Sequence, residues 1–240
     1  MTSLVVNTYE TIAATIVRRW LTFRYQILSR RYGRLVLEEI DKVPLLVLPD
    51  VFNPVLLRTG AFMARAIKEI SLNNDPANWS QLSFLDLGTG SGVGAVFAAQ
   101  QGATVTAIDI NPEAVRCAQL NSMLNHLEDQ IVVYQGDLFE PVQDQQFDVI
   151  SFNPPFYRGK PSHNLDYAWR GVDIFERFAT QLARMLTPNG VALLTLSSDG
   201  DCEELLDLLR DNNFTITIVV QKNFINERVT MYRVAPHAHN

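Results

Sequence analysis

The chain has 240 residues, of which 47% are hydrophobic and 19% charged, so its composition predicts a buried core and argues against disorder. This length fits one large domain, or one domain with a small extension. The formal net charge of −6 disfavours a uniformly basic nucleic-acid binder but leaves a local basic patch open.

The cysteines and the hydropathy pattern exclude further classes. Cys117 and Cys202 have neither a metal-binding nor a redox spacing, so we expect no metal site and a reducing, cytoplasmic compartment. No apolar run reaches the roughly 18 residues of a membrane-spanning helix, and no signal peptide is recognisable. We therefore expect no membrane span, while the oligomeric state is left open.

Residues 1–43 are expected to form an amphipathic helical extension. Residues 1–42 hold seven Lys and Arg against four Asp and Glu. Between residues 8 and 31 the apolar residues recur at steps of four, four, three and four, as on one helix face: Ile12, Ile16, Trp20, Phe23 and Ile27. This stripe favours packing on the following domain or on a second subunit. An RNA-phosphate patch and a membrane-surface helix are the alternatives.

Residues 44–240 are expected to form one domain. A short strand over 44–50 precedes a helix over 55–72 and a turn-rich stretch over 73–81. Apolar runs then predict strands over 84–87, 104–109, 131–135, 147–151 and 191–197. Helices are expected between them, over 92–101, 112–125, 172–186 and 201–212. Asn111-Pro112 starts the second of these helices, and Pro188-Asn189-Gly190 turns the chain out of the third into the next strand.

The last two apolar runs, 214–220 and 228–234, have no helix between them. They predict an antiparallel hairpin at the edge of a sheet. Strands that alternate with helices predict a parallel sheet with both faces covered. The expected fold is therefore α/β, with a doubly wound, mostly parallel, Rossmann-like sheet of seven strands that ends in the antiparallel hairpin.

A glycine-rich turn after the strand at 84–87 is the strongest local signal, and it runs Asp86-Leu87-Gly88-Thr89-Gly90-Ser91-Gly92. Glycines let a backbone turn tightly against a ligand. The carboxylate of Asp86 would repel a pyrophosphate and attract the ammonium group of a sulfonium amino acid. The spacing also differs from the G-x-G-x-x-G of dinucleotide loops. The turn therefore predicts an S-adenosylmethionine site that includes Asp86, Gly88, Thr89, Gly90 and Gly92, and it disfavours a nicotinamide oxidoreductase.

Acids also follow the next two strands. Asp109 ends the strand at 104–109, where a carboxylate usually accepts hydrogen bonds from ribose hydroxyls. Ile110 is expected to pack on the adenine face. Asp137 is expected to accept from the exocyclic amine, and Leu138 to pad the ring.

A rigid polar turn, Asn153-Pro154-Pro155-Phe156, follows the fourth strand. Asn153 offers a side-chain carbonyl acceptor beside the predicted cofactor, and the prolines fix the acceptors of the turn in advance. Two acceptors that hold the hydrogens of a planar amine or amide direct its lone pair toward a methyl donor. Phe156 is expected to stack on the flat acceptor group.

These motifs resemble the class I S-adenosylmethionine-dependent methyltransferases with an Asn-Pro-Pro-aromatic motif, here NPPF, which include release-factor glutamine methyltransferases and N6-adenine methyltransferases. Residues 166–174 are similar to the Ala-Trp-x-Gly segment of the eukaryotic and archaeal-type release-factor branch. Val51-Phe52-Asn53-Pro54 is similar to its Val-Tyr-Glu-Pro element, which closes over the cofactor. The chain departs from that branch at Phe156, where Tyr is usual, and at Asn53.

The resemblance implies an N-methyltransferase that acts on a protein glutamine amide, with a translation factor as a possible substrate. The alternative acceptor is an adenine or guanine of RNA or DNA, which would have to be extruded or single-stranded. A cofactor-binding scaffold without activity is the third hypothesis, and the intact Asn153-Pro154-Pro155 turn argues against it.

Overall fold

The structure of the chain is a computed structural model that describes residues 33–70, 76–155, 157–158, 170–200, 202–225 and 227–237. The helix predicted over residues 8–31 lies outside these ranges, as does Phe156. Within the described ranges, no helix combines the length and the apolar character needed to cross a membrane.

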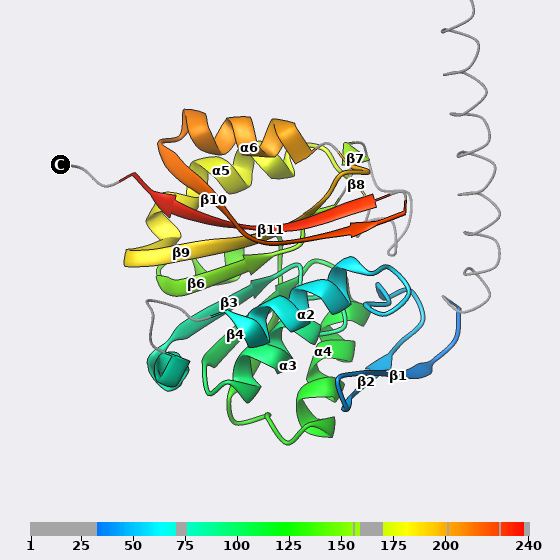
Figure 1. Cartoon of the computed structure of the whole chain (residues 1–240). Coiled ribbons are helices and arrows are strands. Elements are labelled where there is room, and N and C mark those ends of the chain that lie inside the picture. Colours follow the sequence, from blue (N-terminus) through cyan, green and yellow to red (C-terminus); the bar gives the residue numbers. More distant parts are fainter. Residues whose placement is uncertain are drawn as a thin grey trace, which may run out of the picture.

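A seven-stranded sheet forms the centre of the fold, with the strand order β10-β11-β9-β6-β3-β4-β5 (Figure 1). Five strands are parallel to one another, and β11 is antiparallel to both β9 and β10. The predicted sheet and its terminal hairpin are confirmed. The strands are β3 (Ser83–Leu87), β4 (Thr104–Asp109), β5 (Ile131–Gln135), β6 (Phe147–Phe152), β9 (Leu186–Ser197), β10 (Phe214–Phe224) and β11 (Glu227–Pro236).

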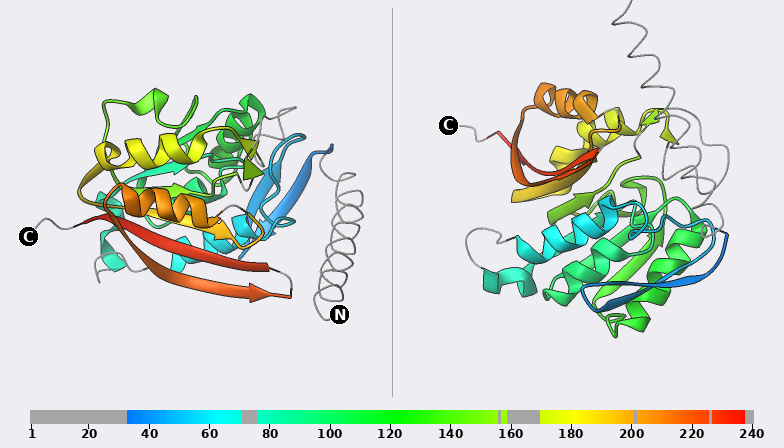
Figure 2. Two further views of the ribbon diagram at one scale, coloured as in Figure 1. Left: turned by 90° about the horizontal axis from the view of Figure 1, so that it is seen from above. Right: turned by 45° about the vertical axis from the view of Figure 1, so that its right-hand side comes forward.

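Helices cover both faces of this sheet (Figures 1 and 2). α2 (Thr59–Glu69), α3 (Val93–Gln100) and α4 (Pro112–Leu124) lie on one face, and α5 (Ile174–Met185) and α6 (Cys202–Asp211) on the other. The 3-10 helices η2 (Pro76–Gln81) and η3 (Glu140–Val142) lie in connections. In β3, Phe84 joins the core beneath α2 and α3, whereas Leu85 joins the core beneath α5 and α6. This alternation places the next residue, Asp86, on the α3 side.

A small hairpin precedes the main sheet, formed by β1 (Val36–Ile40) and β2 (Val43–Val47). It is anchored on α4 by Asn121, whose Oδ1 accepts from Leu46 N and whose Nδ2 donates to Leu46 O, both at 2.7 Å. The predicted strand over 44–50 is therefore one arm of a hairpin. The domain boundary expected after residue 43 falls inside β2, so residues 36–43 share this hairpin with the domain that follows.

Two other boundaries differ from the predictions. The helix expected over 55–72 begins at Thr59, because the buried Asn53 forms a turn in which its Oδ1 accepts from Val55 N and Leu56 N. β9 begins directly after α5, so Pro188-Asn189-Gly190 lies within a bulged strand instead of a separating turn. Thr187 closes that bulge by donating its hydroxyl to Asp148 at 2.9 Å.

A pair of very short parallel strands was not predicted: β7 (Tyr157–Arg158) and β8 (Arg170–Gly171). β7 follows the Asn153-Pro154-Pro155 turn, and β8 leads into α5. The pairing therefore ties the start of α5 to the end of β6, next to the pocket described below.

Candidate active site

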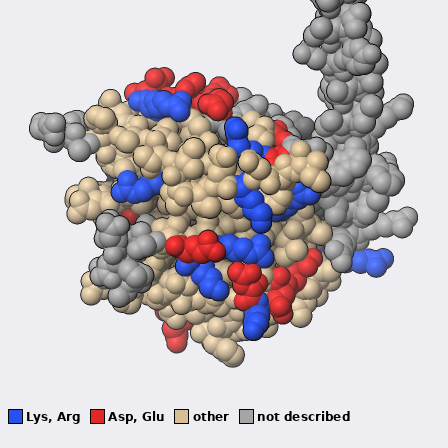
Figure 3. All heavy atoms as spheres, in the orientation of Figure 1, with Lys and Arg blue, Asp and Glu red and all other residues tan. Residues whose placement is uncertain are grey.

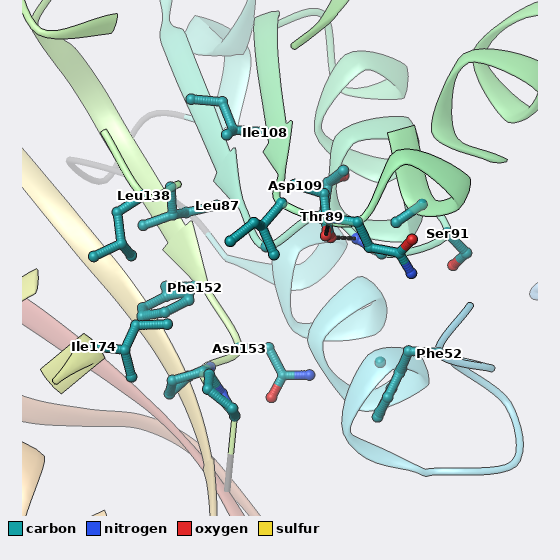
Figure 4. A pocket seen from close by; sticks show the side chains of 18 of the residues that line it. Phe52, Leu87, Thr89, Ser91, Ile108, Asp109, Leu138, Phe152, Asn153 and Ile174 are labelled. Carbon is teal, nitrogen blue, oxygen red and sulfur yellow. Dashed lines mark hydrogen bonds between the residues drawn. The ribbon is translucent and has the colours of Figure 1, made fainter. Parts of the chain in front are cut away.

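A pocket opens at the carboxyl ends of β3, β4, β5 and β6, the edge where parallel α/β sheets bind ligands (Figure 4). It is completed by the loop between β2 and α2 and by the start of α5. Most of the residues predicted from the sequence meet here: Gly88, Thr89, Gly90, Asp109, Ile110, Asp137, Leu138, Asn153, Pro154 and Pro155. Asp86 and Gly92 do not line it.

The glycine loop has the backbone conformation that its sequence predicts. Gly88, Gly90 and Gly92 all have positive φ, at 63°, 56° and 81°, which a residue with a Cβ rarely adopts. A Cβ on Gly92 would lie 2.9 Å from the Cα of Ala118 in α4. Gly92 therefore lets α4 pack closely against the loop, while Gly88 and Gly90 present backbone to the pocket.

Asp86 lies beneath the loop. Its side chain is buried, and its Oδ2 accepts from Thr89 Oγ1 at 2.7 Å and from Ala95 N at 2.9 Å. Burial raises the pKa of Asp86 to about 7, although both hydrogen bonds lower it. A Cβ on Gly94 would come within 2.5 Å of this carboxylate. Asp86 therefore holds the loop against the start of α3, and its contact with a ligand ammonium group stays a prediction.

Asp109 lies at the end of β4 and is only partly buried. Its two oxygens accept from Gly90 N at 2.8 Å and Asn111 N at 2.9 Å. Burial raises the pKa of Asp109 to about 6, opposed by backbone donors at Asn111, Gly90 and Ile110. A carboxylate has about four acceptor positions, so Asp109 keeps capacity for a hydroxyl donor in the pocket. Next to it, Ile110 exposes apolar surface to the pocket.

Asp137 follows β5 and pairs with Arg177 of α5, whose Nη1 donates to Asp137 Oδ2 at 2.8 Å. The neighbouring Leu138 is buried in the pocket wall and has a φ of 50°. Ile174, also on α5, contributes a second aliphatic side chain. Figure 4 shows Leu138, Ile174 and Phe152 grouped on one side of the pocket. This side offers a flat apolar slot with a carboxylate beside it.

Asn153 lies where β6 ends, between Phe152 and Phe52 (Figure 4). Its Nδ2 donates to Thr59 Oγ1 at 3.3 Å. Its Oδ1 is buried and has no hydrogen-bond partner among the described residues. An unsatisfied buried acceptor costs roughly 1–3 kcal/mol, so this oxygen marks a place for a donor from outside the chain. Pro154 and Pro155 line the adjoining wall, and Phe156 lies outside the described residues.

Sequence reasoning missed several lining residues, among them Asp50, Ser91 and Ile174. Phe52, which the family resemblance indicated, does line the pocket. The loop that carries Asp50 and Phe52 is held by Asn111, whose Nδ2 donates to Asp50 O at 2.9 Å while its Oδ1 caps α4 by accepting from Glu113 N. Only the cap was readable from the sequence, because the loop contact joins residues far apart in the chain.

Comparisons with known proteins agree with this geometry. Residues 69–224 match the family described as methyltransferase small domain. The chain is 30% identical over 189 residues to a putative protein N5-glutamine methyltransferase of Methanocaldococcus jannaschii, a match that covers 75% of the chain and 89% of that protein. It is 29% identical over 175 residues to a tRNA1(Val) (adenine(37)-N6)-methyltransferase of Porphyromonas gingivalis, covering 68% of the chain but only 64% of that enzyme.

Among solved structures, the chain resembles the T. thermophilus 16S rRNA N2 G1207 methyltransferase in complex with AdoMet and guanosine. The TM-score is 0.61 at 22% identity, covering 85% of this chain and 50% of that one. This likeness establishes the fold, and the sequence matches establish the family. The chain belongs to the methyltransferase small domain family and is an S-adenosylmethionine-dependent methyltransferase.

Proposed function

We propose that the chain transfers a methyl group to the planar nitrogen of a protein glutamine amide. The observation that carries this proposal is the buried, unpaired Oδ1 of Asn153 among the described residues of the pocket wall. The protein N5-glutamine methyltransferase named above, which the chain matches over most of its length, supports the same acceptor.

The polar and apolar groups of the pocket match those of the methyl donor. Asp109 would accept from the ribose hydroxyls, and Asp137 from the exocyclic amine of the adenine. Ile110 and Leu138 would hold the ring between aliphatic side chains, and the backbone of Gly88, Thr89 and Gly90 would follow the amino-acid part of the ligand. When bound, S-adenosylmethionine would supply a methyl group on a sulfonium, which is already an activated electrophile. As the nitrogen–carbon bond forms, the bond from sulfur to the methyl carbon breaks, the neutral thioether S-adenosylhomocysteine leaves, and the nitrogen gives up one proton to solvent.

The Asn153-Pro154-Pro155 turn would position the acceptor. Asn153 Oδ1 accepts one amide N–H, and a backbone carbonyl of the turn accepts the other, so the nitrogen lone pair is directed away from its own carbonyl. Because both prolines have fixed φ, the acceptors are placed before the substrate arrives. Holding the nitrogen in line lowers the barrier by proximity. Phe156 would stack on the flat group.

A nucleobase amine is the second candidate, because the Porphyromonas relative is a tRNA adenine methyltransferase. The same two acceptors would hold an exocyclic amine, provided that the base is extruded or single-stranded. The net charge of −6 favours a protein partner. On the face in Figure 3, basic and acidic side chains of the described residues are interspersed, so this face offers no simple track for phosphates.

The proposal is tested by labelled methyl transfer from S-adenosylmethionine into fractionated cell extract, with the purified full-length chain as enzyme. We expect labelled material that protease degrades and nuclease leaves intact. Label that only nuclease destroys would replace the glutamine acceptor with a nucleobase. Salt titration adds an independent readout, since binding to nucleic acid weakens steeply with ionic strength.

A further inference from the structure

Arg177 links the loop after β5 to the start of α5, beside the pocket. Its Nη1 lies 2.8 Å from Oδ2 of Asp137 and 3.6 Å from Oδ1 of Asp173. Asp137 follows β5, whereas Asp173 and Arg177 belong to the first turns of α5. We propose that Arg177 is a positioning residue for the cofactor, which turns the Asp137 carboxylate so that it selects a purine with a 6-amino group. This inference rests on the cofactor site proposed above.

The backbone that carries Asp137 is already fixed without Arg177. Gly136 N donates to Asp109 O at 3.0 Å, and Glu140 N donates to Asp137 O at 3.1 Å. A Cβ on Gly136 would collide with Pro141, with 2.2 Å to its Cγ. The remaining freedom of Asp137 is therefore in its side chain, and Arg177 removes that freedom.

The donor and acceptor roles in this pair are fixed by its chemistry. A guanidinium can only donate, and an ionised carboxylate can only accept. With Oδ2 hydrogen-bonded to Arg177, Oδ1 is the oxygen that remains as an acceptor for a ligand in the pocket that Asp137 lines. The amine of adenine can donate to it, whereas the 6-carbonyl of hypoxanthine would bring a second acceptor against it. The hydrogen bond to Asp137 raises the pKa of Arg177, so the guanidinium stays a donor.

The exposure of the pair argues against a large contribution to folding stability. The side chains of Arg177 and Asp137 are 34% and 36% exposed, and ion pairs at such positions contribute little to folding stability. Loss of the pair should therefore appear in the choice between ligands and hardly in the melting temperature. Because Ile174 and Arg177 are on one helix, α5 contributes both the apolar wall and this orientation.

The test compares S-adenosylhomocysteine with S-inosylhomocysteine, which replaces the 6-amine by a carbonyl, in calorimetric titrations of the full chain. Arg177→Met removes the donors while keeping a long side chain. We expect it to weaken S-adenosylhomocysteine roughly 10-fold, the size of one charge-assisted hydrogen bond, and S-inosylhomocysteine less than 2-fold. Arg177→Lys should restore part of the preference. Arg184→Met is the matched control, because Arg184 lies on the same helix and donates to Gln181. This control should leave both affinities unchanged.

An Arg177→Met variant that weakens both ligands equally, or neither, would overturn the inference while leaving methyl transfer by the wild-type chain in place. A wild-type chain that binds neither ligand would overturn the cofactor site itself. Thermal unfolding of each variant separates these results from misfolding.

Discussion

The glycine-loop half of the pocket and its Asn153 wall use their polar atoms differently. In the loop half, Asp86 accepts from Thr89 and Ala95, and Asp109 accepts from Gly90 and Asn111. These bonds hold the loop in shape without a ligand. At the end of the neighbouring strand β6, the buried Oδ1 of Asn153 finds no partner among the described residues.

This difference separates two tasks. The two carboxylates of the loop half are hydrogen-bonded within the chain, which preorganises the loop for a ligand. Ser91 Oγ is the exception in this half, because it is buried without a partner among the described residues. A catalytic acceptor that is left unpaired forms its hydrogen bond with the substrate, and this bond accelerates the reaction to the extent that it strengthens in the transition state. The variants below should therefore divide, with those in the loop half changing stability or donor affinity and those at Asn153 changing the rate.

Asn153→Ala should have the largest effect. Methyl transfer should fall roughly 100- to 1,000-fold, as when one preorganised hydrogen-bonding group is removed from an active site. The affinity for S-adenosylhomocysteine should change little, because Asp109 and Asp137 remain. Initial rates and calorimetric titration of the same preparation measure both quantities. Asn223→Ala, at an exposed position on β10, is the control. Retained activity in Asn153→Ala would remove the residue from the chemistry.

Asp86 should make the free energy of unfolding of the ligand-free protein depend on pH. Burial raises the pKa of Asp86 from 3.8 to about 7. Between these values the folded state holds a proton that the unfolded chain has lost, so the Asp86 contribution to stability falls as pH rises. Asp86→Asn keeps an oxygen for Thr89 and Ala95 but does not titrate. Its free energy of unfolding relative to the wild type should increase by roughly 1 kcal/mol per pH unit across this window.

Urea unfolding at about pH 5, 6 and 7 measures this difference in the free energy of unfolding. The difference increases with pH because only the wild type releases a proton when it unfolds. Parallel curves for the two proteins would show that Asp86 is ionised throughout. The picture of a buried acid that holds the loop from beneath would then be wrong.

Asp109→Asn should weaken the methyl donor roughly 10- to 100-fold, the contribution of hydrogen bonds to a charged group. The amide still offers one oxygen to the loop, so the fold should persist. Calorimetric titration of S-adenosylhomocysteine gives the affinity, and Asp144→Asn, at an exposed position, provides the control. An unchanged dissociation constant would cancel the ribose assignment.

The sequence predicted the sheet and the pocket because both are local patterns repeated along the chain. Most of the short apolar runs are separated by a predicted helix, and the runs that form the pocket end in a polar or glycine-rich turn, so their carboxyl ends gather at one edge of a parallel sheet. The direction of Asp86 was also readable, since it alternates with Leu85 and so shares the α3 side with Phe84.

Contacts between segments far apart in the chain could not be predicted from such local patterns. Arg177 reaches Asp137 across 40 residues, and Asn111 holds the loop at Asp50 across 61. β1 was not predicted, because Glu38 and Glu39 interrupt the alternation of apolar and polar residues that marks a strand. In the structure, Glu38 Oε1 accepts a hydrogen bond from Nδ2 of the buried Asn53 at 2.9 Å. A truncation that tests the amphipathic helical extension should therefore stop before β1, since removal of residues 36–43 would take half of a hairpin from the domain.

The central claim is that the methyl group reaches a planar amide nitrogen, and acid hydrolysis of the labelled product tests it most directly. Hydrolysis of an N-methyl amide cleaves the bond between the carbonyl and the nitrogen and releases the label as methylamine. We predict methylammonium from protease-sensitive material, volatile as methylamine once the hydrolysate is made alkaline, and its loss with Asn153→Ala. Release as methanol under mild base would identify an ester and contradict methylation of nitrogen.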